Sequence, residues 1–272
     1  MDVVLRAWGE RAALDHAYDA VAGRFQTLLG ELVGELSELR RPMEEAPQAT
    51  GAVARRMLEA CAPFAGVFLT PMAAVAGAVA DELLAAMTAA APLARAFVND
   101  GGDIALHLEP GASLDIGIAG DMNCGAIPAA SGRIRIASGD GIGGLATSGW
   151  GGRSFSLGIA DSVTVLARNA ASADAAATLI ANAVTIESPA VRRSPARALD
   201  PDSDLGERLV TTHVGLLTIA EIKAALDKGC RLAEEYRARG LIVAAALTLQ
   251  GETLTMGDGL APRALAEEKG TP

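Results

Sequence analysis

Aromatic side chains are scarce in this sequence. Phe, Trp and Tyr make up 3% of the 272 residues, although 50% of the residues are hydrophobic. The core must therefore consist mainly of Ala, Val and Leu, which favours close packing of helices and sheet over clusters of aromatic rings. A chain of this length can form one large domain or two small ones.

Cysteine and histidine are also rare, with three residues of each. Cys61, Cys124 and Cys230 are odd in number and far apart, so they form neither a metal-binding spacing nor a disulfide framework. Cys124 lies in a predicted loop without a nearby base, so we do not expect a nucleophile there. Ser148 matches a nucleophile elbow only in part, and no histidine is well placed beside it. A serine hydrolase is therefore not expected. The three scattered cysteines fit a protein of the reducing cytoplasm.

Positive charge is in deficit. There are 23 Lys and Arg residues against 33 Asp and Glu residues, and the formal net charge is −10. Nucleic acids and anionic membranes both require a basic surface on their protein partner. We therefore expect neither as a partner. A small anionic ligand remains compatible with the sequence, because backbone amides and a metal ion can bind it without Lys or Arg.

Uninterrupted hydrophobic runs are short. The longest, Cys61–Ala80, is broken by two prolines and two glycines, which is typical of a buried turn followed by a core helix rather than a membrane span. The first ten residues lack the apolar segment of a secretion signal. We therefore expect a cytoplasmic protein.

The hydrophobic periodicity predicts helices first, then a strand-rich middle, then a helix and a hairpin. This order is typical of an α+β fold with a mainly antiparallel sheet packed with helices. We expect one domain over residues 1–257 and a frayed tail over 258–272. Helices are predicted over residues 18–41, 50–61, 71–90, 172–184 and 218–240, and strands over 1–8, 94–99, 103–109, 113–119, 132–137, 153–158, 161–167, 241–250 and 253–256.

Three polar residues are predicted to cap helix N-termini: Thr50, Ser172 and Thr218, the last in a capping box with Glu221. The pair Gly251-Glu252 suits a type II′ turn at the C-terminal hairpin. Residues 187–205, rich in Pro, Ser, Asp and Arg, are expected to form an ordered surface loop.

A glycine-dense stretch over residues 139–152 precedes the strand and helix that carry Asp174 and Thr178. Residues 139–144 match the dinucleotide-binding glycine pattern, but residues 145–154 are too rich in glycine to begin the helix that a Rossmann site requires. The stretch is therefore either a loop that offers backbone amides to a phosphate or a structural turn.

Asp174 and Thr178 are four residues apart in a predicted helix, so both project from one face. A carboxylate and a hydroxyl are hard oxygen donors suited to Mg²⁺. The alternative for Asp174 is a carboxylate favoured by the helix dipole. The turn over residues 99–103, Asn-Asp-Gly-Gly-Asp, could present oxygen atoms to a ligand, but its residues are also those usual in tight turns.

These segments occur in a familiar order. Residues 74–81, 98–104 (Val-Asn-Asp-Gly-Gly-Asp-Ile), 146–149 (Ala-Thr-Ser-Gly) and the strand and helix over 163–178 together resemble the ApbE-like superfamily, the FAD:protein FMN transferases. Residues 71–77 resemble a shorter branch of that superfamily. The resemblance implies a T-fold-related α+β fold and a phosphate-bearing ligand such as FAD or FMN.

The resemblance also implies site residues. It places Mg²⁺ on Asp174, Thr178 and a backbone oxygen near Ala73. It implies that the flavin nucleotide or another anionic ligand contacts Asn99, Gly101, Gly102, Asp103, Gly144, Thr147, Ser148 and Gly149.

The sequence departs from the superfamily at three places. An acidic residue is replaced by Thr70, a Lys or Glu is replaced by Ala76, and a His-containing segment after residue 149 is missing. Two interpretations remain open: a Mg²⁺-dependent transferase or hydrolase of unknown substrate, and a non-catalytic ligand-binding or assembly protein on the same fold. The Leu-rich helix over residues 18–41 suggests in addition a homodimer.

Overall fold

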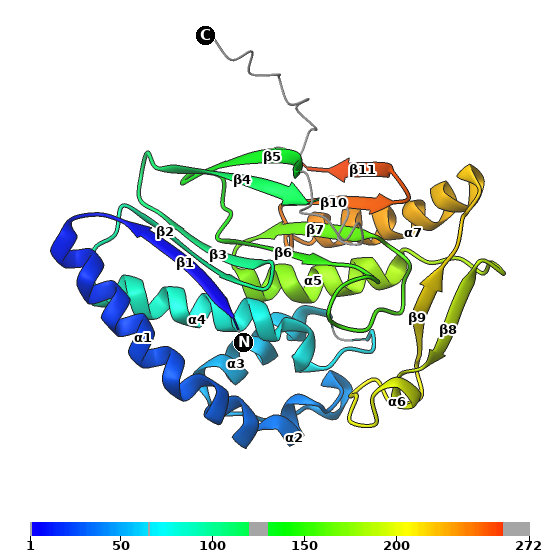
Figure 1. The fold of residues 1–272 in the computed structure, drawn as a ribbon, viewed down its shortest axis with the longest axis horizontal. Helices are drawn as coiled ribbons and strands as arrows, with labels where there is room; N and C mark the ends of the chain where they lie inside the picture. Colours follow the sequence, from blue (N-terminus) through cyan, green and yellow to red (C-terminus); the bar gives the residue numbers. More distant parts are fainter. Residues whose placement is uncertain (1, 65, 120–129, 258–272) are drawn as a thin grey trace, which may run out of the picture.

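The computed structural model describes residues 2–64, 66–119 and 130–257. Its centre is a seven-stranded sheet with the order β1-β2-β3-β6-β7-β10-β11, and neighbouring strands are antiparallel throughout (Figure 1). Its strands are β1 (Val3–Trp8), β2 (Arg95–Asp100), β3 (Asp103–Leu108), β6 (Gly144–Ser148), β7 (Ser162–Ala167), β10 (Ala244–Leu249) and β11 (Glu252–Met256).

Helices cover one face of this sheet in two layers. Helices α4, α5 and α7 contact the strands, and α1 and α3 pack on the outside of α4 (Figure 1). A short 3-10 turn, Pro71–Ala74, leads into α4. The helices are α1 (Arg11–Gly34), α2 (Leu36–Leu39), α3 (Ala52–Cys61), α4 (Val75–Ala90), α5 (Ala170–Ala183), α6 (Ala196–Leu199) and α7 (Ile219–Ala238).

Two hairpins lie outside the main sheet. The hairpin of β4 (Ser113–Ala119) and β5 (Ala130–Ala137) covers the other face of the sheet, where Leu114 and Ile136 pack against Leu106 and Leu145. The hairpin of β8 (Val191–Pro195) and β9 (Leu209–Val214) stands beside the edge of the helical layer (Figure 1). The prediction of an α+β fold with a mainly antiparallel sheet is confirmed.

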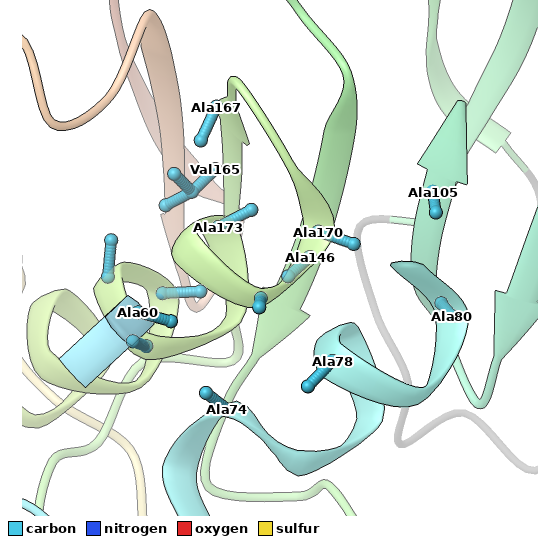
Figure 2. Packing of buried hydrophobic residues seen from close by; sticks show 14 of the residues in the cluster. Ala60, Ala74, Ala78, Ala80, Ala105, Ala146, Val165, Ala167, Ala170 and Ala173 are labelled. Atoms are coloured by element: carbon cyan, nitrogen blue, oxygen red, sulfur yellow. The ribbon is translucent and has the colours of Figure 1, made fainter. Parts of the chain in front are cut away.

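Alanine fills the space between the central helices and the sheet. Ala78 and Ala80 of α4, and Ala170 and Ala173 of α5, lie close to the buried faces of the strands (Figure 2). A Cβ added at Gly77 would overlap the backbone carbonyl of Ala170, so the two helices cross with their backbones almost in contact. The prediction of a core with few aromatic residues and close packing of helices is confirmed.

One stretch within the described residues, Pro71–Ala90, has the length and the mean hydropathy, 1.5, of a membrane span. It packs against α1, α3, α5 and the strands β2 and β3. These contacts are those of a core helix in a globular protein.

The N-terminal helix differs from its prediction. It begins at Arg11 rather than at residue 18, and it ends at Gly34, because Glu35 leaves the helical conformation. The Glu35 carboxylate accepts hydrogen bonds from the backbone N–H groups of Thr50 and Gly51 and from the Thr50 hydroxyl. Thr50 is therefore not the N-cap of α3; Gly51 takes that position without a side-chain cap.

Two segments of the second half were also predicted incorrectly. Residues 153–158 form no strand, because the Asn182 side chain at the end of α5 binds the Leu157 N–H and the Ser156 hydroxyl in place of a neighbouring strand. Residues 187–205 are not a loop throughout. Strand β8 forms there because it pairs with β9, and the short helix α6 follows it.

The C-terminal hairpin forms as expected but turns one residue earlier. Gln250 and Gly251 are its two central residues, and both have positive φ, 46° and 86°. Two positive φ angles define a type I′ turn rather than the predicted type II′ turn.

The capping box of Thr218 and Glu221 at α7 is confirmed. Cys124 and the predicted tail lie outside the described residues.

The helix crossing gives a stability prediction. Gly77→Ala should lower the free energy of unfolding by about 2–3 kcal/mol, because its methyl group would overlap the Ala170 carbonyl. Gly23→Ala in α1 is the matched control, since no atom lies near its added Cβ. The control should raise the free energy of unfolding by about 0.5–1 kcal/mol. Urea unfolding measures both, and equal stabilities for the two variants would contradict the close crossing.

The homodimer stays a prediction, and the structure indicates where to test it. Phe25, Leu29 and Val33 follow one stripe of α1 and are 38%, 60% and 61% exposed. Leu29→Glu should convert a dimer to a monomer in light scattering without unfolding the chain, because the side chain packs little in the protomer. Gln26→Glu adds the same charge on a neighbouring exposed position and should leave the mass unchanged. A wild-type protein with a monomeric mass would disprove the dimer.

Candidate functional site

Two carboxylates lie side by side at the tip of the β2–β3 hairpin. Asp100 and Asp103 are directly paired across the two-residue turn Gly101-Gly102. Both glycines have positive φ, 68° and 117°, as a tight turn of this kind requires. Paired residues project to the same face of a sheet, so both carboxylates face the helices. Like charges directly opposite each other destabilise a hairpin, so this pair requires a reason.

Asp103 is held in place by the next strand. Its Oδ1 accepts a hydrogen bond from the backbone N–H of Thr147 in β6, at 3.2 Å. Burial raises the pKa of Asp103 to about 7, against the lowering effect of the Thr147 N–H, and the Asp100 carboxylate adds to the rise. Burial also raises the pKa of Asp100, while the Arg153 guanidinium opposes the rise.

A third carboxylate comes from helix α5. Asp174 Oδ2 accepts a hydrogen bond from the backbone N–H of Gly77 at the start of α4, at 3.1 Å. Burial, and then the charge of Asp103, raises the pKa of Asp174 well above its usual range. The residue keeps a partly exposed surface although protein surrounds its carboxyl group. The two carboxylates of the hairpin tip therefore act electrostatically on a third from a distant segment of the chain.

Asp174 does not lie in the first turn of its helix. Helix α5 begins at Ala170, and its N-cap is Asn169, whose side chain accepts a hydrogen bond from the Ser172 N–H. The prediction that Ser172 is the cap was therefore wrong. Because the helix starts earlier than predicted, an attraction between Asp174 and the N-terminal dipole of its own helix does not explain its position.

Asp174 nevertheless caps another helix. Asp81 of α4 accepts hydrogen bonds from the N–H groups of Ala170 and Ala171, at 3.0 and 2.9 Å, while Asp174 of α5 binds the N–H of Gly77. Each helix thus supplies a carboxylate to the N-terminus of the other. Asp174 differs from Asp81 in one respect: the charges of two further carboxylates raise its pKa, whereas no other carboxylate contributes to the raised pKa of Asp81.

The other predicted metal ligands, Thr178 and Ala73, lie on α5 and on the 3-10 turn before α4. Thr178 follows Asp174 by one helical turn and is partly exposed, and its hydroxyl has no hydrogen-bond partner among the residues that the structure describes. Ala73 lies in the 3-10 turn that contacts α5. Within the described part of the chain, no three His, Cys, Asp or Glu side chains form a metal site by themselves. A cation would therefore need oxygen atoms from hydroxyl, backbone and ligand, which are donors that Mg²⁺ accepts.

The predicted ligand-contacting residues divide into two groups. Gly101, Gly102 and Asp103 form the hairpin tip, and Thr147 and Ser148 lie on the adjacent strand β6. These five residues are near the carboxylates, and their contact with a ligand stays a prediction.

The positions of the other three predicted ligand-contacting residues, Asn99, Gly144 and Gly149, have structural explanations. The Asn99 side chain accepts a hydrogen bond from the Gly102 N–H, at 2.8 Å, and strand alternation places it on the face opposite Asp100. A Cβ at Gly144 would overlap the backbone of Ala170, and one at Gly149 would overlap the carbonyl of Asp161. Their ligand contacts also stay predictions.

Asp100 belongs to the turn over residues 99–103 that was considered as a source of ligand oxygen atoms, but it was not named as a site residue. Its place opposite Asp103 across a two-residue turn could have indicated it. The contacts of two further charged residues were not predicted. Arg153 lies against Gly101, and Asp204 accepts a short hydrogen bond from the buried Thr70 hydroxyl. No local sequence pattern indicates these last two contacts, since each joins segments far apart in the chain.

The protein is thus of the mixed α/β class, and the carboxylates of Asp100 and Asp103 lie together at the tip of its β2–β3 hairpin. A family described as AbpE bacteria matches residues 1–255, and the chain belongs to this family. The resemblance of its segments to the ApbE-like superfamily is thereby confirmed.

Curated relatives include UPF0280 proteins of methanogenic archaea. The protein of Methanopyrus kandleri is 36% identical over 172 residues, which are 62% of this chain and 64% of the relative. The protein of Methanothrix thermoacetophila is 39% identical over 145 residues, 53% of this chain and 55% of the relative. The matches thus span less than two thirds of the length of these relatives.

Two solved structures are similar at low identity. The apo form of the flavinyl transferase ApbE of Pseudomonas stutzeri is 16% identical with a TM-score of 0.38, over 69% of this chain and 50% of that chain. The ApbE protein of Thermotoga maritima is 16% identical with a TM-score of 0.39, over 91% of this chain and 76% of that chain.

The raised pKa of Asp103 predicts how stability depends on pH. Asp103 binds its proton more tightly when folded, with a pKa of about 7, than when unfolded, near 3.8. Its contribution to stability is therefore complete below about pH 4 and is lost as the pH rises through 7. Asp103→Asn keeps the acceptor for the Thr147 N–H but cannot lose a proton.

Between pH 4 and 8, the stability of the wild type should therefore fall by about 1–2 kcal/mol relative to Asp103→Asn. Thermal and urea unfolding across this pH range measure the difference. Asp19→Asn, on the exposed surface of α1, controls for the change of net charge. Parallel pH profiles for the wild type and Asp103→Asn would show that Asp103 does not hold its proton unusually tightly.

Proposed function

We propose that this protein binds a phosphate-bearing small molecule together with Mg²⁺, with the flavin nucleotides FAD and FMN as the first candidates, and that it catalyses transfer or hydrolysis at the phosphate. The observation that carries the proposal is the convergence of Asp100, Asp103 and Asp174. The charges of both hairpin carboxylates act on Asp174, and a buried carboxylate beside other carboxylates is costly unless it is protonated or binds a cation.

The donor set suits Mg²⁺. Asp174 would hold the cation with the oxygen that Gly77 does not occupy, and Thr178 and a backbone oxygen near Ala73 would complete the protein ligands. When bound, Mg²⁺ neutralises the charge of phosphate oxygens and so favours displacement at phosphorus. The charges of Asp103 and Asp100 near Asp174 support this assignment, because a bound cation would offset them.

The protein's own residues would position the ligand. The tight turn at Gly101-Gly102 leaves the hairpin tip without side chains, which lets a ligand approach the backbone closely. The Thr147 N–H holds the Asp103 carboxylate toward the helices and so keeps it beside Asp174. A rigid arrangement of this kind accelerates a reaction by orientation and by electrostatics rather than by a covalent intermediate.

The choice of a flavin nucleotide rests on family membership and on the resembling segments. The departures at Thr70 and Ala76 argue for an altered pocket, and Thr70 is buried and bonded to Asp204. We further propose that the ligand is a small molecule rather than a nucleic acid and that the protein acts in the cytoplasm. The net charge of −10 supports the first of these statements, and the cysteine usage supports the second.

Calorimetric titration with FAD, with Mg²⁺ and with EDTA, tests the proposal. The wild type should bind FAD only when Mg²⁺ is present. Asp174→Asn keeps an acceptor for the Gly77 N–H but removes the charge, so it should weaken Mg²⁺-dependent binding at least about tenfold, or about 1.4 kcal/mol. Asp19→Asn should bind like the wild type.

A turnover assay separates an enzyme from a binding protein. Release of FMN or AMP from FAD over several turnovers, lost in Asp174→Asn, would establish catalysis. Mg²⁺-dependent binding without turnover would favour the non-catalytic interpretation. Binding that Asp174→Asn leaves intact would remove Asp174 from the metal site.

A further inference from the structure

Arg153 is a cation at the acidic site for which the proposed function has no role. It follows the glycines of residues 149–152, and its side chain is exposed. A Cβ added at Gly101 would overlap its guanidinium group, so Arg153 lies directly over the turn between the two hairpin carboxylates. Only glycine at position 101 permits this approach, and Gly101 also has the positive φ that favours glycine.

The loop that carries Arg153 is anchored at its base. The Trp150 N–H donates a hydrogen bond to the Ala160 carbonyl at 2.9 Å, and its indole N–H donates to the Asp161 carboxylate at 3.2 Å. Gly149 packs against the Asp161 carbonyl without room for a side chain. These contacts fix the start of the loop at residues 149 and 150, three residues before Arg153.

The donors of Arg153 are not used within the protein. Its guanidinium attracts the Asp100 and Asp103 carboxylates, yet it makes no hydrogen bond or ion pair with any residue that the structure describes. A guanidinium offers five N–H donors in a planar fork that matches two oxygen atoms of a phosphate. An arginine whose donors are unused within the described residues, beside a proposed site for a phosphate-bearing ligand, is suited to bind an oxyanion.

We propose that Arg153 binds a phosphate group of the ligand at the hairpin tip, as an anion subsite beside the metal site of Asp174. This inference rests on the proposed function for the identity of the ligand. Arg153 acts electrostatically on Asp100 and Asp103, and these two carboxylates act in turn on Asp174 of α5. A ligand with two adjacent phosphates could contact Arg153 with one phosphate and the cation with the other, so the site selects diphosphates over monophosphates.

Calorimetric titration with inorganic pyrophosphate tests the subsite, with Mg²⁺ and with EDTA. In Mg²⁺, Arg153→Gln should bind pyrophosphate at least about tenfold more weakly than the wild type. Arg153→Lys keeps the charge but not the planar fork and should give an intermediate affinity. Arg135→Gln removes a positive charge that is paired with Asp115 on the distant β4–β5 hairpin, and it should bind like the wild type.

The outcomes separate this inference from the proposed function. Titration with Mg²⁺ alone should be unchanged in Arg153→Gln and weakened in Asp174→Asn. Pyrophosphate binding that persists in EDTA and in Asp174→Asn, yet is lost in Arg153→Gln, would support the subsite and overturn the metal site. Wild-type protein that binds no pyrophosphate in Mg²⁺, or equal affinities for the wild type and Arg153→Gln, would overturn the subsite.

Discussion

The crossing of helices α4 and α5 is the constraint on which the rest of the structure depends. Gly77 brings the two backbones so close that no side chain fits between them. At the crossing, Asp81 of α4 accepts hydrogen bonds from Ala170 and Ala171, and Asp174 of α5 accepts one from Gly77. The amides at a helix N-terminus have no partner within their own helix. The two carboxylates therefore satisfy buried donors and hold the helices in register.

The same crossing creates the candidate site. Helix α5 packs on β3, β6 and β7 through alanines, so it lies close enough to the sheet for Asp174 to act on the β2–β3 hairpin tip (Figure 2). There it meets Asp100 and Asp103, two carboxylates paired across a tight turn. Capping alone explains Asp174, as it explains Asp81, but it does not explain why the charges of Asp103 and Asp100 add to the rise in the pKa of Asp174. This gathering of carboxylates is the observation on which the proposed cation site rests.

Two glycines of the stretch before α5 are explained by close packing. Gly144 and Gly149 each have backbone atoms of a neighbouring segment where a side chain would lie. Of the two interpretations of this stretch, the structural turn accounts for these two glycines. Arg153 follows the stretch, and its guanidinium lies against Gly101 in the turn that joins Asp100 and Asp103.

The sequence by itself determined the α+β class and most helices and strands, because hydrophobic spacing is a local property. It also indicated Asp103 and Asp174, which stand in recognisable local segments. Tertiary structure alone decided that Arg153 meets Gly101 and that Asp204 meets Thr70, since both contacts join segments distant in the chain. It also decided the helix caps and the course of residues 153–158, because a neighbouring segment can supply a hydrogen-bond partner that local sequence does not show. The sequence alone could not show that the charges of Asp100 and Asp103 act on Asp174, because these residues come together only in the folded chain.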